Sequence, residues 1–184
     1  MFQKALVIGS PGAGKSTFAR RLRDASGLPL HYLDMLWHRP DGTNVSREAF
    51  DAALQAVLRQ ERWIIDGNYL RTLEARLNAC DAVFLLDFPL RVCLDGAAER
   101  IGKAREDMPW VEQSFDPEFR QWITDFPKNQ LPRIRKLLQN HAAGREVVQF
   151  HSRREAEDWL AAFSRSRCEK GVPHDPDPRL FRPF

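Results

Sequence analysis

Cysteines are few in this sequence, and a long hydrophobic run is missing. The three cysteines, Cys80, Cys93 and Cys168, are odd in number and far apart, which argues against a disulfide-stapled secreted domain. No apolar stretch approaches the roughly 20 residues that a membrane-spanning helix needs. No secretory segment precedes the first strand-like run. We therefore expect a protein of the reducing cytoplasm, with no disulfide and no membrane contact.

The sequence also lacks a large excess of positive or negative charge, and the signatures of several enzyme classes are missing. The formal net charge is +3 over 184 residues, which gives little support for nucleic acid as the main partner. The five histidines show no metal-ligand spacing, and no serine or cysteine lies in a nucleophile signature, so hydrolases of those kinds are excluded. The length and the 43% hydrophobic content fit one compact domain.

One stretch near the start carries a specific signal. The apolar run 4–8 leads into a segment that matches G-x-x-x-x-G-K-[ST] in full, and a helix-like run follows. Small residues leave its backbone N–H groups open to phosphate oxygens, and the helix directs its positive dipole end at the anion. Lys15 is expected to reach the β- and γ-phosphates, and Ser16 to bind Mg²⁺. A glycine-rich turn that binds nothing is the alternative, which pattern and context together disfavour. The predicted ATP-binding residues are Gly9, Ser10, Pro11, Gly12, Ala13, Gly14, Lys15, Ser16 and Thr17.

Three strand-like runs end at an aspartate, namely Asp34, Asp66 and Asp87. Ligands of parallel α/β sheets bind outside the carboxyl ends of the strands, so these carboxylates are candidates for the site. Asp34 is predicted to contact the acceptor or to act as its general base, and the alternative is a capping or turn aspartate. A Walker-B carboxylate must hold Mg²⁺ beside the P-loop, and we assign this role to Asp66. Asp87 is a rival that spacing alone does not exclude.

Two further residues are predicted on the acceptor side. Trp37 either stacks on a base or covers the core, and the sequence does not separate these two roles. Arg71 follows Asp66 on a helix and has the planar guanidinium that clamps a phosphate. Arg76 offers the same chemistry, and a surface pair with Glu74 is the alternative for either arginine.

The segment from about residue 100 to 115 is charged and interrupted by glycine and proline, as expected of a mobile lid over a phosphoryl-transfer site. Arg100 and Arg105 are predicted to neutralise the transferring phosphoryl group. They lie five residues apart and do not share a helix face, so they act together only if the helix ends between them. An exposed basic helix end is the alternative.

The stretch from Trp110 to Phe126 is rich in aromatic residues, which we interpret as packing and not as a base-stacking platform. Its helix is predicted to begin at Pro117, with Asp116 as its N-cap. Pro127 is predicted to end that helix after Phe126.

Five strand-like runs alternate with helices, which predicts an α/β fold with a five-stranded, mainly parallel sheet and helices on both faces. One domain is expected over residues 1–167, followed by a proline-rich tail over residues 168–184. Arg133, Arg135 and Lys136 point outward from a predicted helix and form the one basic patch that we would assign to nucleic acid.

Together, these motifs resemble those of the adenylate-kinase-like P-loop kinases, and more closely those of the bacterial DNA topology modulation proteins (FlaR-like). The resemblance covers about residues 1–165. Besides the P-loop it rests on His31-Tyr32-Leu33-Asp34 with Trp37, on Trp63 to Tyr69, on Leu86 to Pro89, on Arg105 to Met108 and on Phe126-Pro127-Lys128. It implies a three-layer P-loop fold of nucleotide-kinase type, with the P-loop strand central and the strand ending at Asp66 beside it. This neighbour relation favours Asp66 over Asp87 as the Mg²⁺ carboxylate.

The same resemblance implies a substrate-binding segment after Asp34 and a short lid that includes Arg100 and Arg105. The run Asn68 to Arg71 departs from the phenylalanine-proline-arginine of true adenylate kinases, so the resemblance does not extend to adenylate as the acceptor. The expected function is transfer of the γ-phosphoryl of Mg·ATP to a small, nucleotide-like acceptor. The alternatives are an ATP-dependent regulator that binds DNA and an ATPase switch without an acceptor.

Overall fold

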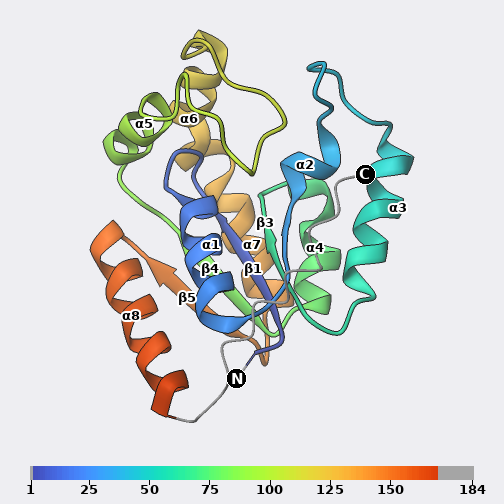
Figure 1. Cartoon of the computed structure of the whole chain (residues 1–184), viewed down its shortest axis with the longest axis vertical. Coiled ribbons are helices and arrows are strands. Elements are labelled where there is room, and N and C mark those ends of the chain that lie inside the picture. The colour runs from blue at the N-terminus through green and yellow to red at the C-terminus, as the bar shows by residue number, and fades with distance from the viewer. Residues whose placement is uncertain (1, 170–184) are drawn as a thin grey trace.

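The protein, seen as a computed structural model, is described over residues 2–169 (Figure 1). Its elements are β1 (Lys4–Gly9), α1 (Lys15–Ser26), β2 (Leu30–Tyr32), α2 (Leu33–Trp37), α3 (Arg47–Leu58), β3 (Trp63–Asp66), α4 (Leu70–Ala79), β4 (Ala82–Leu86), α5 (Leu90–Ala98), α6 (Pro117–Asn129), α7 (Leu131–His141), β5 (Glu146–Phe150) and α8 (Arg153–Glu169). The last helix ends at Glu169, just past the predicted domain boundary at residue 167. The rest of the predicted tail, residues 170–184, lies outside the described residues.

The five strands form one sheet in the order β2-β3-β1-β4-β5, and every neighbouring pair is parallel. The P-loop strand β1 is central, with β3 on one side and β4 on the other. Val7 pairs with Asp66 and Gly9 pairs with Leu86, so the carboxyl ends of these three strands meet at one edge. The predicted fold class is confirmed.

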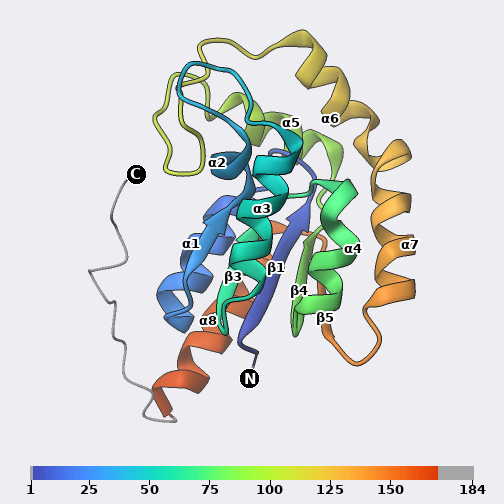
Figure 2. The same cartoon turned by 90° about the vertical axis from the view of Figure 1, so that its right-hand side faces the viewer.

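Helices cover both faces of the sheet, so the central strands are buried on both sides (Figure 1). Residues alternate along β1: Ala5 and Val7 contribute to one core, and Leu6 and Ile8 contribute to the other. The first core is covered by α1 and α8 and the second by α3, α4 and α7, as Figure 2 shows from the side. Among residues 2–169, no helix is both long and apolar enough to span a membrane.

The P-loop packs so closely on its neighbours that three glycines have no room for a side chain. A Cβ on Gly9 would overlap the carbonyl of Leu86, and a Cβ on Gly12 would overlap the carbonyl of Cys93. Both glycines also have positive φ, +137° and +76°. Gly96 in α5 has an ordinary helical backbone, yet its Cβ would overlap the carbonyl oxygen of Gly12. Gly96 therefore fixes how closely α5 approaches the P-loop, although it lies outside the P-loop motif.

The prediction that Pro127 ends its helix after Phe126 is wrong, because α6 contains Pro127 and continues to Asn129. Proline removes one intrahelical hydrogen bond, but the N–H of Gln130 still donates to the carbonyl of Phe126 at 2.9 Å. The break comes later, where α7 begins with Pro132 in its first turn. The predicted start of α6 is confirmed, since the Asp116 carboxylate accepts hydrogen bonds from the first-turn N–H groups.

We predict that Gly96→Ala destabilises the protein although alanine favours a helix. The new methyl group forces α5 away from the P-loop, an overpacking that typically costs about 1–3 kcal/mol. The matched control is Asp95→Ala, an exposed neighbour in the same helix. Urea unfolding of the two variants measures the difference. Equal stability would show that the contact between α5 and the P-loop is easily relaxed.

Candidate nucleotide and acceptor site

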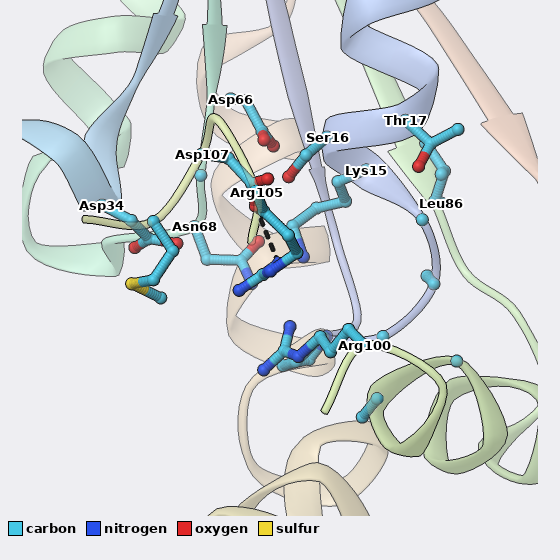
Figure 3. Close-up of a pocket in the computed structure, with 18 of the residues that line it drawn as sticks. Lys15, Ser16, Thr17, Asp34, Asp66, Asn68, Leu86, Arg100, Arg105 and Asp107 are labelled. Atoms are coloured by element: carbon cyan, nitrogen blue, oxygen red, sulfur yellow. Dashed lines mark hydrogen bonds and ion pairs between the residues drawn. The ribbon is translucent and has the colours of Figure 1, made fainter. Parts of the chain in front are cut away.

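A cavity of about 1060 Å³ opens at the carboxyl edge of the sheet. The P-loop and the end of β3 line it, together with Asp34, residues of the 99–116 segment and the α6 helix. Figure 3 shows the side chains of Lys15, Ser16 and Asp66 close together, with Asp34 to their left and Arg100 below them. The structure therefore brings most of the predicted site residues into one space.

The P-loop begins directly after β1 and ends in the first turn of α1. Gly14 takes a left-handed conformation, φ +89°, and α1 begins at the next residue. The positive end of the α1 dipole and the unpaired N–H groups of its first turn thus lie at the cavity, where they favour an anion. The Lys15 ammonium donates to the carbonyl of Ser10 at 3.1 Å. Desolvation lowers the pKa of Lys15, although the Asp66 carboxylate opposes this shift, so a phosphate here would stabilise the cation.

Asp66 has the environment expected of a metal-binding carboxylate. It is buried, and its Oδ1 atom has no hydrogen-bond partner. Burial raises the pKa of Asp66 to about 6, against the opposing effects of the Lys15 ammonium and the Ser16 hydroxyl. A buried oxygen without a partner requires an explanation, and Mg²⁺ supplies one because it is commonly held by one or two carboxylates and the substrate phosphates. The residues present fit the ion.

Asp87, the rival carboxylate, points elsewhere. It accepts hydrogen bonds from Arg135 at 2.6 Å and from Gln149 at 2.8 Å, and it lies outside the large cavity. Although β3 and β4 both flank β1, only the aspartate after β3 lies near Ser16. This geometry favours Asp66 in the metal role.

The residues after Asp66 connect β3 to the P-loop and to Asp34. The Asn68 side chain accepts a hydrogen bond from the N–H of Gly9 at 3.0 Å and donates one to the carbonyl of the same residue at 2.8 Å. The Tyr69 hydroxyl donates to Asp34 Oδ1 at 2.8 Å. One short segment thus holds both the start of the P-loop and the candidate acceptor carboxylate. Asn68 and Tyr69 belong to a motif of the sequence, but neither contact could be predicted from it.

Arg76 binds the backbone of the segment 67–69. Its side chain is fully buried, and its guanidinium donates to the carbonyls of Gly67, Asn68 and Tyr69, with a distance of 2.7 Å for Gly67. Burial lowers the pKa of Arg76 to about 9. Because all its visible partners are backbone carbonyls, Arg76 acts on the loop and does not reach a substrate phosphate.

Two predicted acceptor-side residues are not brought to the cavity. Trp37 packs edge-on against Phe50, with ring centroids 5.5 Å apart, and covers the core. Arg71 makes two hydrogen bonds to the Asp51 carboxylate, at 2.9 and 2.6 Å, on the surface. Neither lines the cavity. The geometry therefore favours the core role for Trp37 and a surface ion pair for Arg71, with Asp51 and not Glu74 as the partner.

The lid arginines both face the cavity. The α5 helix ends at Ala98, before both arginines. Helix geometry therefore does not force them onto different faces, and both line the cavity. Arg100 pairs with Glu112 at 2.8 Å, and Arg105 pairs with Asp107 at 2.9 Å and with Glu112 at 3.2 Å. Desolvation lowers the pKa of Arg100, although Glu112 opposes this shift. Each arginine is held in place by carboxylates of the lid itself.

Two acidic residues of the lid also connect it to the body of the protein. Asp107 is buried and accepts a hydrogen bond from Arg20 of α1 at 3.3 Å. Glu106 accepts from Arg23 of α1 at 3.2 Å and from the Tyr32 hydroxyl of β2. No role for Glu106 or Asp107 was predicted from the sequence. The only signal was an acidic pair within an otherwise basic segment, which does not identify its distant partners.

No family model matches this chain, and no curated protein matches its sequence. Among solved structures, it is similar to the shikimate kinase of Acinetobacter baumannii in complex with shikimate, with a TM-score of 0.57 and 15% identity over 92% of this chain and 96% of that one. It is also similar to the shikimate kinase of Bacteroides thetaiotaomicron, with a TM-score of 0.55 and 15% identity over 94% and 100%. These likenesses establish the fold, which this chain shares with the two shikimate kinases. The acceptor must be argued from the residues of this chain.

We predict that Asn68→Ala destabilises the protein by about 1–3 kcal/mol and weakens ATP binding. The substitution leaves the buried N–H and carbonyl of Gly9 without partners at the point where the P-loop begins. Asn78→Ala, an exposed position in α4, is the matched control. Urea unfolding and ATP titration measure the two effects. Unchanged ATP affinity in a destabilised Asn68→Ala variant would limit the role of Asn68 to stability.

Proposed function

We propose that this protein transfers the γ-phosphoryl group of Mg·ATP to a small, nucleotide-like acceptor. The observation that carries the proposal is one cavity lined by the P-loop Lys15, by Arg100 and Arg105 of the lid segment and by Asp34. Asp34 was predicted at a strand end, but it lies in the first turn of α2, since β2 ends at Tyr32. Phosphoryl transfer depends mainly on positioning and on electrostatic stabilisation, and this arrangement supplies both.

The chain's own groups divide the work between the two substrates. Backbone N–H groups of the P-loop and the Lys15 ammonium bind the phosphates of ATP, while Arg100 and Arg105 leave their carboxylate partners to stabilise the γ-phosphoryl group. Ser16 and Asp66 would hold Mg²⁺, which neutralises charge on the β- and γ-phosphates when bound.

Asp34 acts on the acceptor. It orients the hydroxyl group and takes its proton as the acceptor oxygen bonds to phosphorus. The bond from phosphorus to the bridging oxygen breaks, and ADP leaves with the electron pair. The hydrogen bond from Tyr69 occupies Asp34 Oδ1, so the other carboxylate oxygen is the one available to the acceptor.

Other observations support parts of this proposal. The Acinetobacter baumannii protein with the same fold is named a kinase and holds shikimate, a small molecule. The sequence motifs support a further proposal, that the chain belongs with the FlaR-like DNA topology modulation proteins. A cytoplasmic setting is part of the same proposal.

The DNA-binding alternative gains no support from the geometry of its basic patch. Arg135 is paired with Asp87 at 2.6 Å, which neutralises the central cation of the patch. Only Arg133 and Lys136 are left on that surface of α7. Two exposed cations are a small electrostatic footprint for DNA. The ATPase alternative uses the same P-loop, and an acceptor assay separates it from the kinase.

We predict that Lys15→Ala lowers transfer of labelled phosphate from Mg·ATP to the acceptor by at least about a hundredfold, because a cation at the γ-phosphoryl group is lost. Lys136→Ala, which removes an exposed cation of the basic patch, is expected to leave transfer unchanged. Equal loss in both variants, or retention in Lys15→Ala, would contradict the assignment. Release of phosphate to water at the same rate with and without acceptors would favour the ATPase switch.

We also predict that Asp34→Asn lowers kcat by about a hundredfold or more while the affinity for ATP stays the same. The amide preserves the shape of the side chain but cannot accept a proton from the acceptor hydroxyl. Asp95→Asn on the exposed face of α5 is the control. Steady-state kinetics with ATP and acceptor varied separately provide the measurement. An unchanged kcat would assign the general-base role elsewhere.

A further inference from the structure

We infer, on the basis of the proposed function, that the acceptor is an uncharged molecule with a flat, apolar body, of the nucleoside class, and not a nucleoside monophosphate. The acceptor side of the cavity offers aromatic side chains and one carboxylate, but no cation that is free to bind a phosphate. Among the nucleotide-like acceptors of the proposed function, only those without a phosphate group fit.

Two tryptophans line the cavity, one from the lid and one from α6. Trp110 packs edge-on against His38, with centroids 4.8 Å apart, and the N–H of His38 donates to the carbonyl of Asp34. Trp110 therefore lies on the Asp34 side. Trp122 stacks on Phe119 at 6.0 Å, and the Arg100 guanidinium lies over the Phe119 ring at 4.9 Å, so Trp122 extends the aromatic lining beside Arg100.

Trp122 differs from the other aromatic residues of its helix. The interpretation as packing holds for Phe126, which is 1% exposed, but Trp122 is 41% exposed and lines the cavity. A large aromatic ring that is left open in a cavity gains free energy by stacking on a flat ligand.

The arginines of the cavity are already paired. Each arginine that lines it, among the described residues, has a carboxylate of this chain within ion-pair distance: Arg20 with Asp107, Arg21 with Glu157, Arg100 with Glu112, Arg105 with Asp107 and Glu112, and Arg153 with Glu99. Lys15, Arg100 and Arg105 are needed by the phosphates of ATP. The phosphate of a charged acceptor would therefore meet no spare cation in this cavity.

Two arginines that follow Tyr69 in the sequence do not change this balance. Arg71 is bound to Asp51 outside the cavity, and Arg76 is buried against backbone carbonyls. A phosphate dianion would instead face the Asp34 carboxylate, and like charges at short range repel. Recognition of phosphate usually relies on an arginine or lysine that is free to pair with it.

Two polar groups that line the cavity suit an uncharged acceptor. The second oxygen of Asp34 accepts a hydrogen bond from a hydroxyl group. The Gln130 side chain lines the cavity and makes no hydrogen bond within the described part of the chain, so it can both donate and accept. An acceptor with a hydroxyl group for Asp34, a flat ring for the tryptophans and an amide-like edge for Gln130 has the features of a nucleoside.

The test uses matched pairs of acceptors that differ only in the phosphate. Full-length protein with Mg·ATP labelled at the γ position is offered adenosine, guanosine, cytidine and thymidine, each beside its 5′-monophosphate, with glycerol as a small polyol. We expect at least one nucleoside to be labelled with a kcat/KM at least about tenfold above that of its monophosphate. A monophosphate that is the better member of its pair overturns the inference.

The remaining outcomes separate this inference from the proposed function. If only glycerol is labelled, in a reaction that Lys15→Ala abolishes, the inference fails and the kinase stands. If ATP binds but nothing is labelled, both fail.

Trp122→Ala tests the aromatic wall separately. Its expected effect is an increase of about tenfold in KM for the nucleoside, the scale of one lost stacking contact, with KM for ATP unchanged. Val147→Ala is the matched control, because Val147 is an apolar residue of similar exposure, 43%, that lies on β5 outside the cavity. Trp122 is exposed, so folding should survive, and thermal unfolding checks this. An unchanged KM for the nucleoside would exclude stacking on Trp122.

Discussion

The site depends on one buried guanidinium group. Arg76 donates to the carbonyls of the segment that follows β3, and this includes Tyr69, whose φ of +32° is uncommon for a residue with a side chain. Held in this way, the segment directs Asn68 to the P-loop and the Tyr69 hydroxyl to Asp34. The P-loop and Asp34, the proposed nucleotide and acceptor sides, are therefore aligned by the same short segment, which explains why an arginine is buried at that point.

Ion pairs hold the lid segment against the P-loop helix. Glu112 and Asp107 neutralise the two lid arginines, and Asp107 also contacts Arg20 of α1, the helix that begins at the P-loop. In the absence of phosphate, the paired arginines are spared the cost of isolated buried charges. When phosphates replace the carboxylates as partners, the guanidinium groups need to move only within the cavity.

Much of the fold could be predicted from local pattern, because apolar runs, caps and the P-loop motif are written in consecutive residues. The strand-end position of Asp66 follows from such signals, whereas the central position of the P-loop strand was implied only by the resemblance to nucleotide kinases. Gly96 and Asn68 could not be predicted, since their roles come from contacts with Gly12 and Gly9 that only the tertiary fold creates. Arg71 was assigned to phosphate for its chemistry, but its direction is set by Asp51 on another helix.

The distribution of charge in the cavity gives the two halves different tasks. The nucleotide half concentrates N–H groups, a lysine and the lid arginines where the phosphates of ATP would lie, and the free energy of binding these phosphates can displace the lid carboxylates. An acceptor that carried its own phosphate would compete for the same arginines and would add negative charge beside Asp34. In the proposed function, an uncharged acceptor leaves both arginines to the γ-phosphoryl group. Selection against a charged acceptor thus also keeps the arginines in position for transfer.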